Sequence, residues 1–164
     1  MDPEAQFPRT SPGDEAGPET AATAVTEAVA EAETVLIQVP ADADYLPVIR
    51  SASAHVATKA GYTLSEVSDL RLAVDEACGL LLRHTVHDGQ SADGVNGVGD
   101  LVCRFILEGV ALRVVLSREA RNAAPPQSDE FGWTILSALV DDIVWRVDGP
   151  TVHVEILKRR AAGL

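Results

Sequence analysis

The chain has 164 residues, of which 46% are hydrophobic, and this is enough for one domain with a single core. Its formal net charge is −12 at pH 7, and residues 1–33 hold eight acids against Arg9 alone, so 7 of the net negative charges lie at the N-terminal end. Such a chain, without a basic stripe, is repelled by nucleic acids and by anionic lipids. The composition therefore indicates partners that are proteins.

The sequence offers few candidates for metal or redox chemistry. Cys78 and Cys103 stand in apolar patterns without metal-site spacing, which predicts buried thiols rather than a disulfide or a catalytic cysteine. His84 and His87 could share a helical face, but without a further Cys or His nearby they are expected to border a loop. The N-terminus lacks the basic and apolar regions of a signal peptide, and apolar runs stay short of the roughly 20 residues of a membrane span. We expect a reduced, cytoplasmic protein.

The N-terminal part of the chain predicts an acidic tail, one strand and one helix. Residues 1–33 carry too little large apolar surface to fold, so they are expected to be disordered, although 21–33 could form a frayed helix. A strand is predicted over 34–40 and ends at a proline. The next helix is expected to be capped by Asp44 and to stop near Gly61. Its apolar positions are Leu46, Ile49, Val56 and Ala57.

A second helix is predicted from about Leu64 to Val86, with Thr63 or Ser65 as its cap. Apolar residues recur there every three or four positions and form one stripe: Val67, Leu70, Ala73, Val74, Ala77 and Leu81. Residues 88–99 follow as a polar, glycine-rich stretch. This stretch predicts a mobile loop and lacks the lysine of a phosphate-binding P-loop.

The second half of the chain predicts four strands and one helix. In chain order, the predicted elements are strands over 101–107 and 110–116, a loop over 117–129, a helix over 130–142, and strands over 143–147 and 151–157. Tight turns at Glu108-Gly109 and Asp148-Gly149-Pro150 join the strands in pairs. The cationic end at 158–160 is expected to be solvated. The whole order predicts an α+β fold, a two-layer sandwich whose mostly antiparallel sheet has helices on one face.

Three segments, in order and at matching separations, resemble one family. Residues 69–78, Asp-Leu-Arg-Leu-Ala-Val-Asp-Glu-Ala-Cys, resemble the first ATP-site helix of the GHKL ATPases, which have the Bergerat fold. Residues 132–143 resemble the glycine-led helix after the nucleotide lid of that family. Arg50 lies where its anti-sigma factors place a partner-binding arginine. Over residues 34–158 the chain is similar to these anti-sigma factors, most of all to the divergent actinobacterial branch that regulates stress or developmental sigma factors.

The resemblance implies a domain organisation and a set of partners. It divides the chain into an acidic tail over 1–33, a GHKL ATPase-like anti-sigma domain over 34–158 and a C-terminal tail over 159–164. Members of the family are serine kinases that sequester a sigma factor and are released by an anti-anti-sigma protein of the STAS type. The implied partners are therefore a sigma factor, a STAS-domain protein and a second copy of the chain, with no direct contact to nucleic acid or membrane.

The chain departs from the family at the positions that bind the nucleotide. Glu76 matches the catalytic acid, but Leu80 replaces the magnesium-binding asparagine and Arg118 replaces the aspartate that accepts the adenine amino group. The family's later glycine positions hold Ala120, Asn122, Glu130 and Gly132. Leu80 has no lone pair for Mg²⁺, and an acid at position 130 opposes bound phosphates. We expect ATP and Mg²⁺ binding to be weak or lost, and hence an anti-sigma factor that works without a cofactor.

Alternatives stay open from the sequence alone. The chain could be an active serine kinase with an unusual nucleotide geometry, or a small-ligand or nucleotide sensor in which Arg118 and Arg121 receive an anion. Glu76 is either a vestigial catalytic base or a helix carboxylate that is solvated or paired with Arg83. Arg50 is either a partner contact or an exposed, inert charge.

Overall fold

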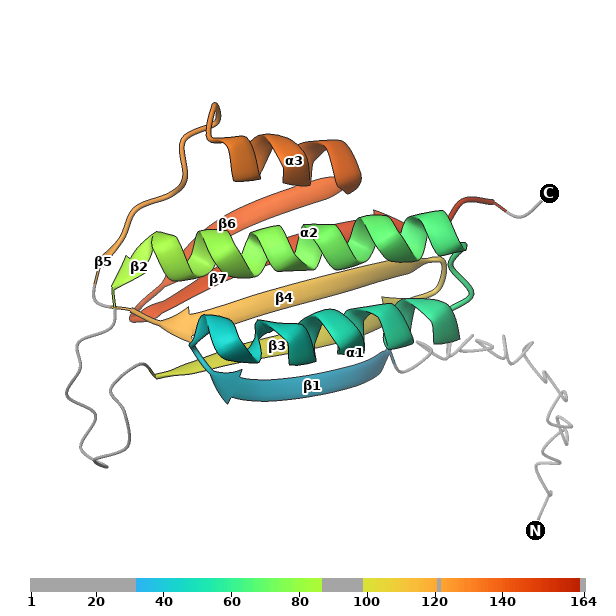
Figure 1. Ribbon diagram of the computed structural model, residues 1–164, viewed down its shortest axis with the longest axis horizontal. Coiled ribbons are helices and arrows are strands. Elements are labelled where there is room, and N and C mark those ends of the chain that lie inside the picture. Colours follow the sequence, from blue (N-terminus) through green and yellow to red (C-terminus); the bar gives the residue numbers. More distant parts are fainter. Residues whose placement is uncertain (1–31, 87–98, 121, 163–164) are drawn as a thin grey trace, which may run out of the picture.

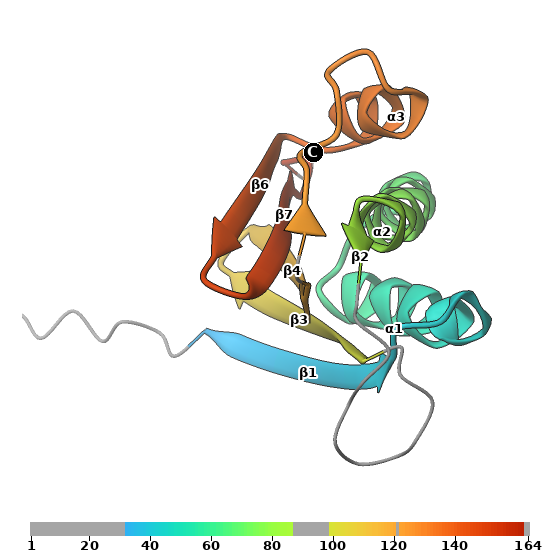
Figure 2. The ribbon, with the colours of Figure 1, turned by 90° about the vertical axis from the view of Figure 1, so that its left-hand side faces the viewer.

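The computed structural model describes residues 32–86, 99–120 and 122–162 of the chain. Within these ranges, five strands form one antiparallel sheet in the order β1-β3-β4-β7-β6. Three α-helices lie side by side on one face of this sheet, as Figures 1 and 2 show from two directions. The predicted α+β class, a two-layer sandwich with helices on one face, is confirmed.

The order of the main elements agrees with the prediction, but the helix predicted up to Val86 ends at Arg83, and Thr85–Val86 form a short strand. The strands of the large sheet are β1 (Glu33–Pro40), β3 (Asp100–Glu108), β4 (Ala111–Glu119), β6 (Asp142–Asp148) and β7 (Thr151–Arg159). The helices are α1 (Leu46–Lys59), α2 (Leu64–Arg83) and α3 (Phe131–Leu139), with a 3-10 turn η1 (Ala43–Tyr45) before α1. At the end of α2, a second, two-stranded sheet pairs β2 (Thr85–Val86) with β5 (Asn122–Ala123).

The core lies between the sheet and the helices, and its strands contribute alternate residues. Fully buried positions in the three central strands are Leu101, Cys103, Phe105, Leu112, Val114, Leu116, Val152, Val154 and Ile156. This period of two is what a sheet with one covered face requires. The predicted stripe of α2 is buried as expected, and Cys78 and Leu80 join it. Both thiols are free, and burial raises the pKa of Cys78 to about 12 and that of Cys103 well above its ordinary value.

The helix starts match the predictions only in part. Thr63 caps α2 as predicted, because its hydroxyl accepts from the backbone N–H of Glu66 at 3.3 Å while the Glu66 carboxylate accepts from the N–H of Thr63 at 2.7 Å. The predicted cap at Asp44 is wrong. Asp42 instead accepts from the N–H of Asp44 at 2.9 Å and starts the 3-10 turn, so α1 begins only at Leu46.

Strand β4 is longer than predicted, and the loop expected over 117–129 is wrong at its start. The pairing with β7 continues to the end of β4, where Arg118 lies opposite Val152 and Glu119 opposite Thr151. At the turn between β6 and β7, Gly149 adopts a φ of 56° and lets β7 return directly along β6. The helix predicted over 130–142 is also shorter, since Asp142 already belongs to β6.

The cationic end at 158–160 is attached to the fold, contrary to the expectation of a merely solvated end. The Lys158 ammonium donates to the carbonyl of Leu139 at 2.7 Å, and the Arg160 guanidinium donates to the carbonyl of Ala60 at 2.8 Å. Both acceptors lie at helix C-termini, of α3 and α1, where cations are favoured. Helix α1 stops beside Gly61, as predicted, and that glycine has a φ of 80°.

Parts of two predictions fall outside the described residues. The expected disordered tail over 1–33 is described only at its last two residues, and Glu33 already belongs to β1. The loop over 88–99 is described only at Gly99. Among the helices of the described ranges, none combines the length and the apolar character of a membrane span.

Candidate functional site

Helix α2 carries the run 69–78 and lies between α1 and α3 in the helix layer (Figure 2). Successive helical residues point about 100° apart, so one helix can serve neighbours on both sides. Asp75 contacts α1, while the next residue, Glu76, lies against the start of α3. The two flanks of α2 therefore form two different candidate sites.

The flank toward α3 brings together two of the predicted residues, Glu76 and Gly132. A Cβ added to Gly132 would lie 3.1 Å from the Oε2 atom of Glu76 and 3.1 Å from the Nη2 atom of Arg83. The absence of a side chain at position 132 thus lets α3 begin directly against α2. No ion pair joins Glu76 to Arg83 within the described part of the chain, and the Arg83 guanidinium lies 3.7 Å from the Glu130 carboxylate.

Leu80, which is predicted to stand at the position of the family's metal ligand, is a core residue. Its side chain is 0% exposed, and its Cδ2 atom would lie 3.3 Å from a Cβ at position 132. It therefore lies in the core, on the side of α2 that packs against the start of α3. Since Mg²⁺ demands oxygen ligands, an aliphatic side chain in this place does not fit a metal site.

Glu130 joins the start of α3 to the end of α2. Its Oε2 atom lies 2.7 Å from Nε2 of His84, and its Oε1 atom lies 3.7 Å from Nη2 of Arg83. The edge of the His84 ring packs against Trp145 of β6, with ring centroids 6.1 Å apart. Helix α3 therefore starts from a carboxylate that is held by two basic side chains of the α2 terminus.

His84 thus binds a carboxylate in this structure, and His87 lies outside the described residues. Within the described ranges, no group of three or more histidine, cysteine or acidic side chains is arranged to hold a metal ion.

The other residues that are predicted to match the family's first nucleotide motifs lie at the end of β4 and just after it. Arg118 faces the helix layer with 6% of its surface exposed, and burial lowers the pKa of its guanidinium. Ala120 donates its backbone N–H to the carbonyl of Pro150 at 2.9 Å. Asn122 belongs to β5 and pairs with Val86. Arg118 is therefore placed inside the fold rather than on a loop, and Arg121 lies outside the described residues.

The flank of α2 toward α1 holds the predicted partner-binding residue. Both Nε and Nη2 of Arg50 donate to Oδ1 of Asp75, at 3.1 Å and 2.5 Å. The two side chains are 39% and 31% exposed, so the pair lies at the surface between the helices. Sequence reasoning missed Asp75. Its only signal was an acid on α2 that could face Arg50 once the two helices pack as an antiparallel hairpin.

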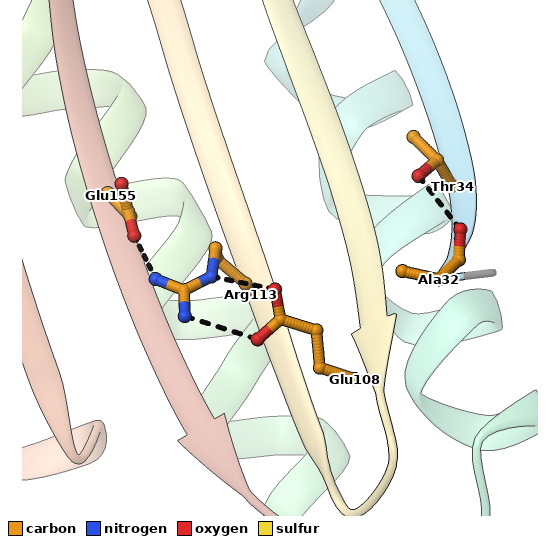
Figure 3. Close-up of polar contacts among 5 residues, drawn as sticks. All are labelled: Ala32, Thr34, Glu108, Arg113 and Glu155. Atoms are coloured by element: carbon orange, nitrogen blue, oxygen red, sulfur yellow. Dashed lines mark hydrogen bonds and ion pairs between the residues drawn. The ribbon is translucent and has the colours of Figure 1, made fainter. Parts of the chain in front are cut away.

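The face of the sheet away from the helices presents a second, different surface. Figure 3 shows Arg113 of β4 between Glu108 and Glu155, with Nε and Nη2 donating to both Glu108 oxygens at 3.1 Å and Nη1 donating to Glu155. These carboxylates raise the pKa of Arg113 above its ordinary value, Glu108 first. The residues Leu36 and Val144 on this face are 54% and 41% exposed. At the β1 edge in Figure 3, Thr34 donates its hydroxyl to the carbonyl of Ala32 at 3.3 Å.

The sequence of residues 39–156 matches the family described as the histidine kinase-like ATPase domain. The chain belongs to this family. The histidine kinase-like ATPase match lies within the predicted domain over 34–158 and covers both flanks of α2. The predicted resemblance to the GHKL anti-sigma factor kinases is confirmed by this match and by the relatives described next.

Curated relatives of the chain are serine-protein kinases named RsbW. The protein from Bacillus licheniformis is 30% identical over 142 residues, which cover 75% of this chain and 84% of that protein. The protein from Bacillus subtilis is 31% identical over 88 residues, which cover 54% of this chain and 51% of that protein. The chain thus spans about half the length of some curated relatives that it matches and most of another.

A solved structure shares the fold. It is described as the crystal structure of the RsbU and RsbW domains of Rv1364c from Mycobacterium tuberculosis. The match has a TM-score of 0.58 at 17% sequence identity and covers 78% of this chain and 32% of that one. At this identity the likeness establishes the architecture alone.

Proposed function

We propose that the chain is an anti-sigma factor that binds a sigma factor and releases it to a STAS-type anti-anti-sigma protein. Family membership supports partner switching in general. The contrast between the two flanks of α2 supports partner switching without ATP binding. The α1 flank keeps an accessible arginine at the surface. The α3 flank fills the nucleotide positions with a buried leucine and a paired glutamate.

Partner exchange on such a surface needs no chemistry on the chain itself. Two proteins that bind overlapping patches exclude one another, so the competitor wins by its affinity and concentration. In this proposal the sigma factor and the STAS-domain protein both contact the region around Arg50. The exchange takes place in the cytoplasm and controls transcription in stress or development.

The contacts of the α3 flank support loss of ATP binding. Phosphoryl transfer depends on positioned phosphates and on metal ions that neutralise their charge. Leu80 offers no oxygen to Mg²⁺ and is sealed in the core. The carboxylate of Glu130 already binds His84 and lies close to Arg83, so phosphates brought there would meet a like charge. Glu76 is then left without a substrate to activate.

Calorimetric titration with Mg-ATP is expected to show no binding tighter than about millimolar, because Leu80 offers no oxygen to Mg²⁺ and the Glu130 carboxylate opposes phosphates. The RsbW protein of Bacillus subtilis, titrated under the same conditions, is the control. Incubation of the chain with ATP and its anti-anti-sigma partner should likewise leave no phosphoserine on that partner. A micromolar dissociation constant, or a phosphorylated partner, would establish the active serine kinase instead.

We further propose that the chain forms a homodimer through the uncovered face of the sheet. This face carries the exposed aliphatic residues Leu36 and Val144, whose burial would be favourable. Light scattering is expected to give twice the 17.3 kDa of one chain. Leu36→Asp is expected to give one chain mass with unchanged circular dichroism. A monomeric wild-type protein at micromolar concentration would contradict this proposal.

The decisive experiment for the proposed function is affinity purification of the chain from its native cell, followed by mass spectrometry. A sigma factor and a STAS-domain protein are expected among the captured proteins, and each should be depleted when the other is added in excess. Capture without any subunit of transcription initiation would overturn the proposal.

A further inference from the structure

The ion pair between α1 and α2 uses only part of the Arg50 guanidinium. A guanidinium is planar and presents five N–H donors, which form a side edge at Nε and Nη2 and an end edge at Nη1 and Nη2. One of the two carboxylate oxygens of Asp75, Oδ1, accepts the hydrogen bonds from both Nε and Nη2, so Asp75 holds the side edge. Among the described residues, no group pairs with Nη1.

The Arg50–Asp75 pair is too exposed to serve mainly as a stabilising ion pair of the fold. With side chains 39% and 31% exposed, both charges remain close to water, and exposed ion pairs contribute little to the stability of a fold. The packing of α1 on α2, in which Ile49, Val74 and Cys78 are buried, already fixes the two helices relative to each other. The pair therefore fixes a side chain rather than the helices.

An arginine side chain that is already fixed in one conformation favours the binding of a partner protein. A free arginine at the surface samples many rotamers, and a partner that captures it must remove that freedom. Asp75 removes it in advance and leaves the end edge of the guanidinium unused. Because Oδ1 accepts both hydrogen bonds, a single oxygen at this place is sufficient for the geometry.

We propose that Asp75 is a positioning residue, which holds the side edge of Arg50 so that its end edge is presented to an oxygen acceptor on the protein partner. This inference rests on the proposed function, because it assigns Arg50 to the partner surface. It adds a residue of α2 to a contact that the sequence places on α1 alone. It also predicts that partner binding requires an oxygen at the position of Oδ1 in residue 75, but does not require the negative charge of that residue.

The test uses the full chain and the sigma factor captured with it, with affinities measured by surface plasmon resonance. Asp75→Ala removes the acceptor and is expected to weaken binding about 10-fold, as expected for coupled neighbours. Asp75→Asn keeps an oxygen at Oδ1 and is expected to stay within about 3-fold of the wild type. Asp69→Ala removes a carboxylate of the same helix, for which the structure records no hydrogen bond or ion pair, and is the matched control with unchanged affinity.

A second measurement follows Arg50 directly. In wild-type and Asp75→Asn protein, the Nε–H resonance of Arg50 should show the relaxation of an ordered group, and in Asp75→Ala protein that of a mobile one. In an Arg50→Ala background, Asp75→Ala should have no further effect on affinity. If the wild-type chain binds the sigma factor and Asp75→Ala binds it equally well, this inference fails while the proposed function stands. If the wild-type chain binds no sigma factor, the proposed function fails and takes this inference with it.

Discussion

Arg50→Glu is expected to abolish binding of the sigma factor and of the anti-anti-sigma protein while the fold stays intact. The substitution places a carboxylate beside Asp75, where the wild type has a guanidinium 2.5 Å from Oδ1. In the proposed function both partners contact Arg50 and would then meet a repulsive charge. Loss of a hot-spot arginine costs about 2 kcal/mol or more of binding free energy, at least about 30-fold in affinity. The cost to folding is about 1 kcal/mol or less, because the pair is partly exposed.

Pull-down of each purified partner measures the loss, and thermal unfolding by circular dichroism measures the integrity of the variant. Arg159→Glu is the matched control, since it reverses an exposed charge at the end of β7 on the sheet. Retention of both partners by Arg50→Glu would remove the α1 flank from the binding surface. A large drop in melting temperature would instead give Arg50 a structural role.

Leu80→Asn, which introduces the amide that the family resemblance predicts at a metal site, is expected to destabilise the protein without producing ATP binding. The side chain of Leu80 is 0% exposed, so the amide would be buried among aliphatic groups without hydrogen-bond partners. Loss of apolar burial and an unsatisfied amide together cost about 3 kcal/mol. For a domain of this size that lowers the melting temperature by roughly 10 °C.

Differential scanning calorimetry measures this change, and titration with Mg-ATP checks for restored binding. Leu80→Met is the control, because a swap of similar volume and polarity should cost less than about 1.5 kcal/mol. An asparagine variant with wild-type stability and micromolar affinity for Mg-ATP would show that position 80 lines an open site. It would also reverse the proposal that nucleotide binding has been lost.

Local patterns were sufficient to predict the fold class and the order of its main elements. Residues Leu101, Cys103 and Phe105 alternate with more exposed neighbours, and this period of two identifies a strand with one buried face. The stripe along α2 recurs with helical spacing and was predicted to within a few positions. Such patterns are written in consecutive residues, so a single sequence is enough to recognise them.

The end of β4 could not be predicted in this way. The run Ser117-Arg118-Glu119 has the composition of a loop, and a buried arginine interrupts the apolar alternation that identifies strands. Its strand conformation follows from pairing with β7, more than thirty positions away. The position of Asp42 as the capping residue, rather than Asp44, likewise depends on a 3-10 turn that local propensity did not indicate.

The residues of the candidate site could be predicted from the sequence, but their contacts could not. Resemblance to a family identified Arg50, Glu76 and Gly132 from their motifs. It could not reveal the contacts of Arg50 with Asp75 or of His84 with Glu130, because these join residues 25 and 46 positions apart. In both cases the sequence shows only the charges, and the packing of three helices decides which of them meet.

The neighbouring positions 75 and 76 explain how these features can change independently. A rotation of one residue along α2 turns a side chain from one adjoining helix to the other. A substitution at position 76 therefore changes a contact with α3 and removes no atom of the contact between Asp75 and Arg50 of α1. Under the proposed function, evolution can therefore remove an enzymatic activity by point mutation on one side of α2. Binding of the regulatory partners on the other side of the helix is retained.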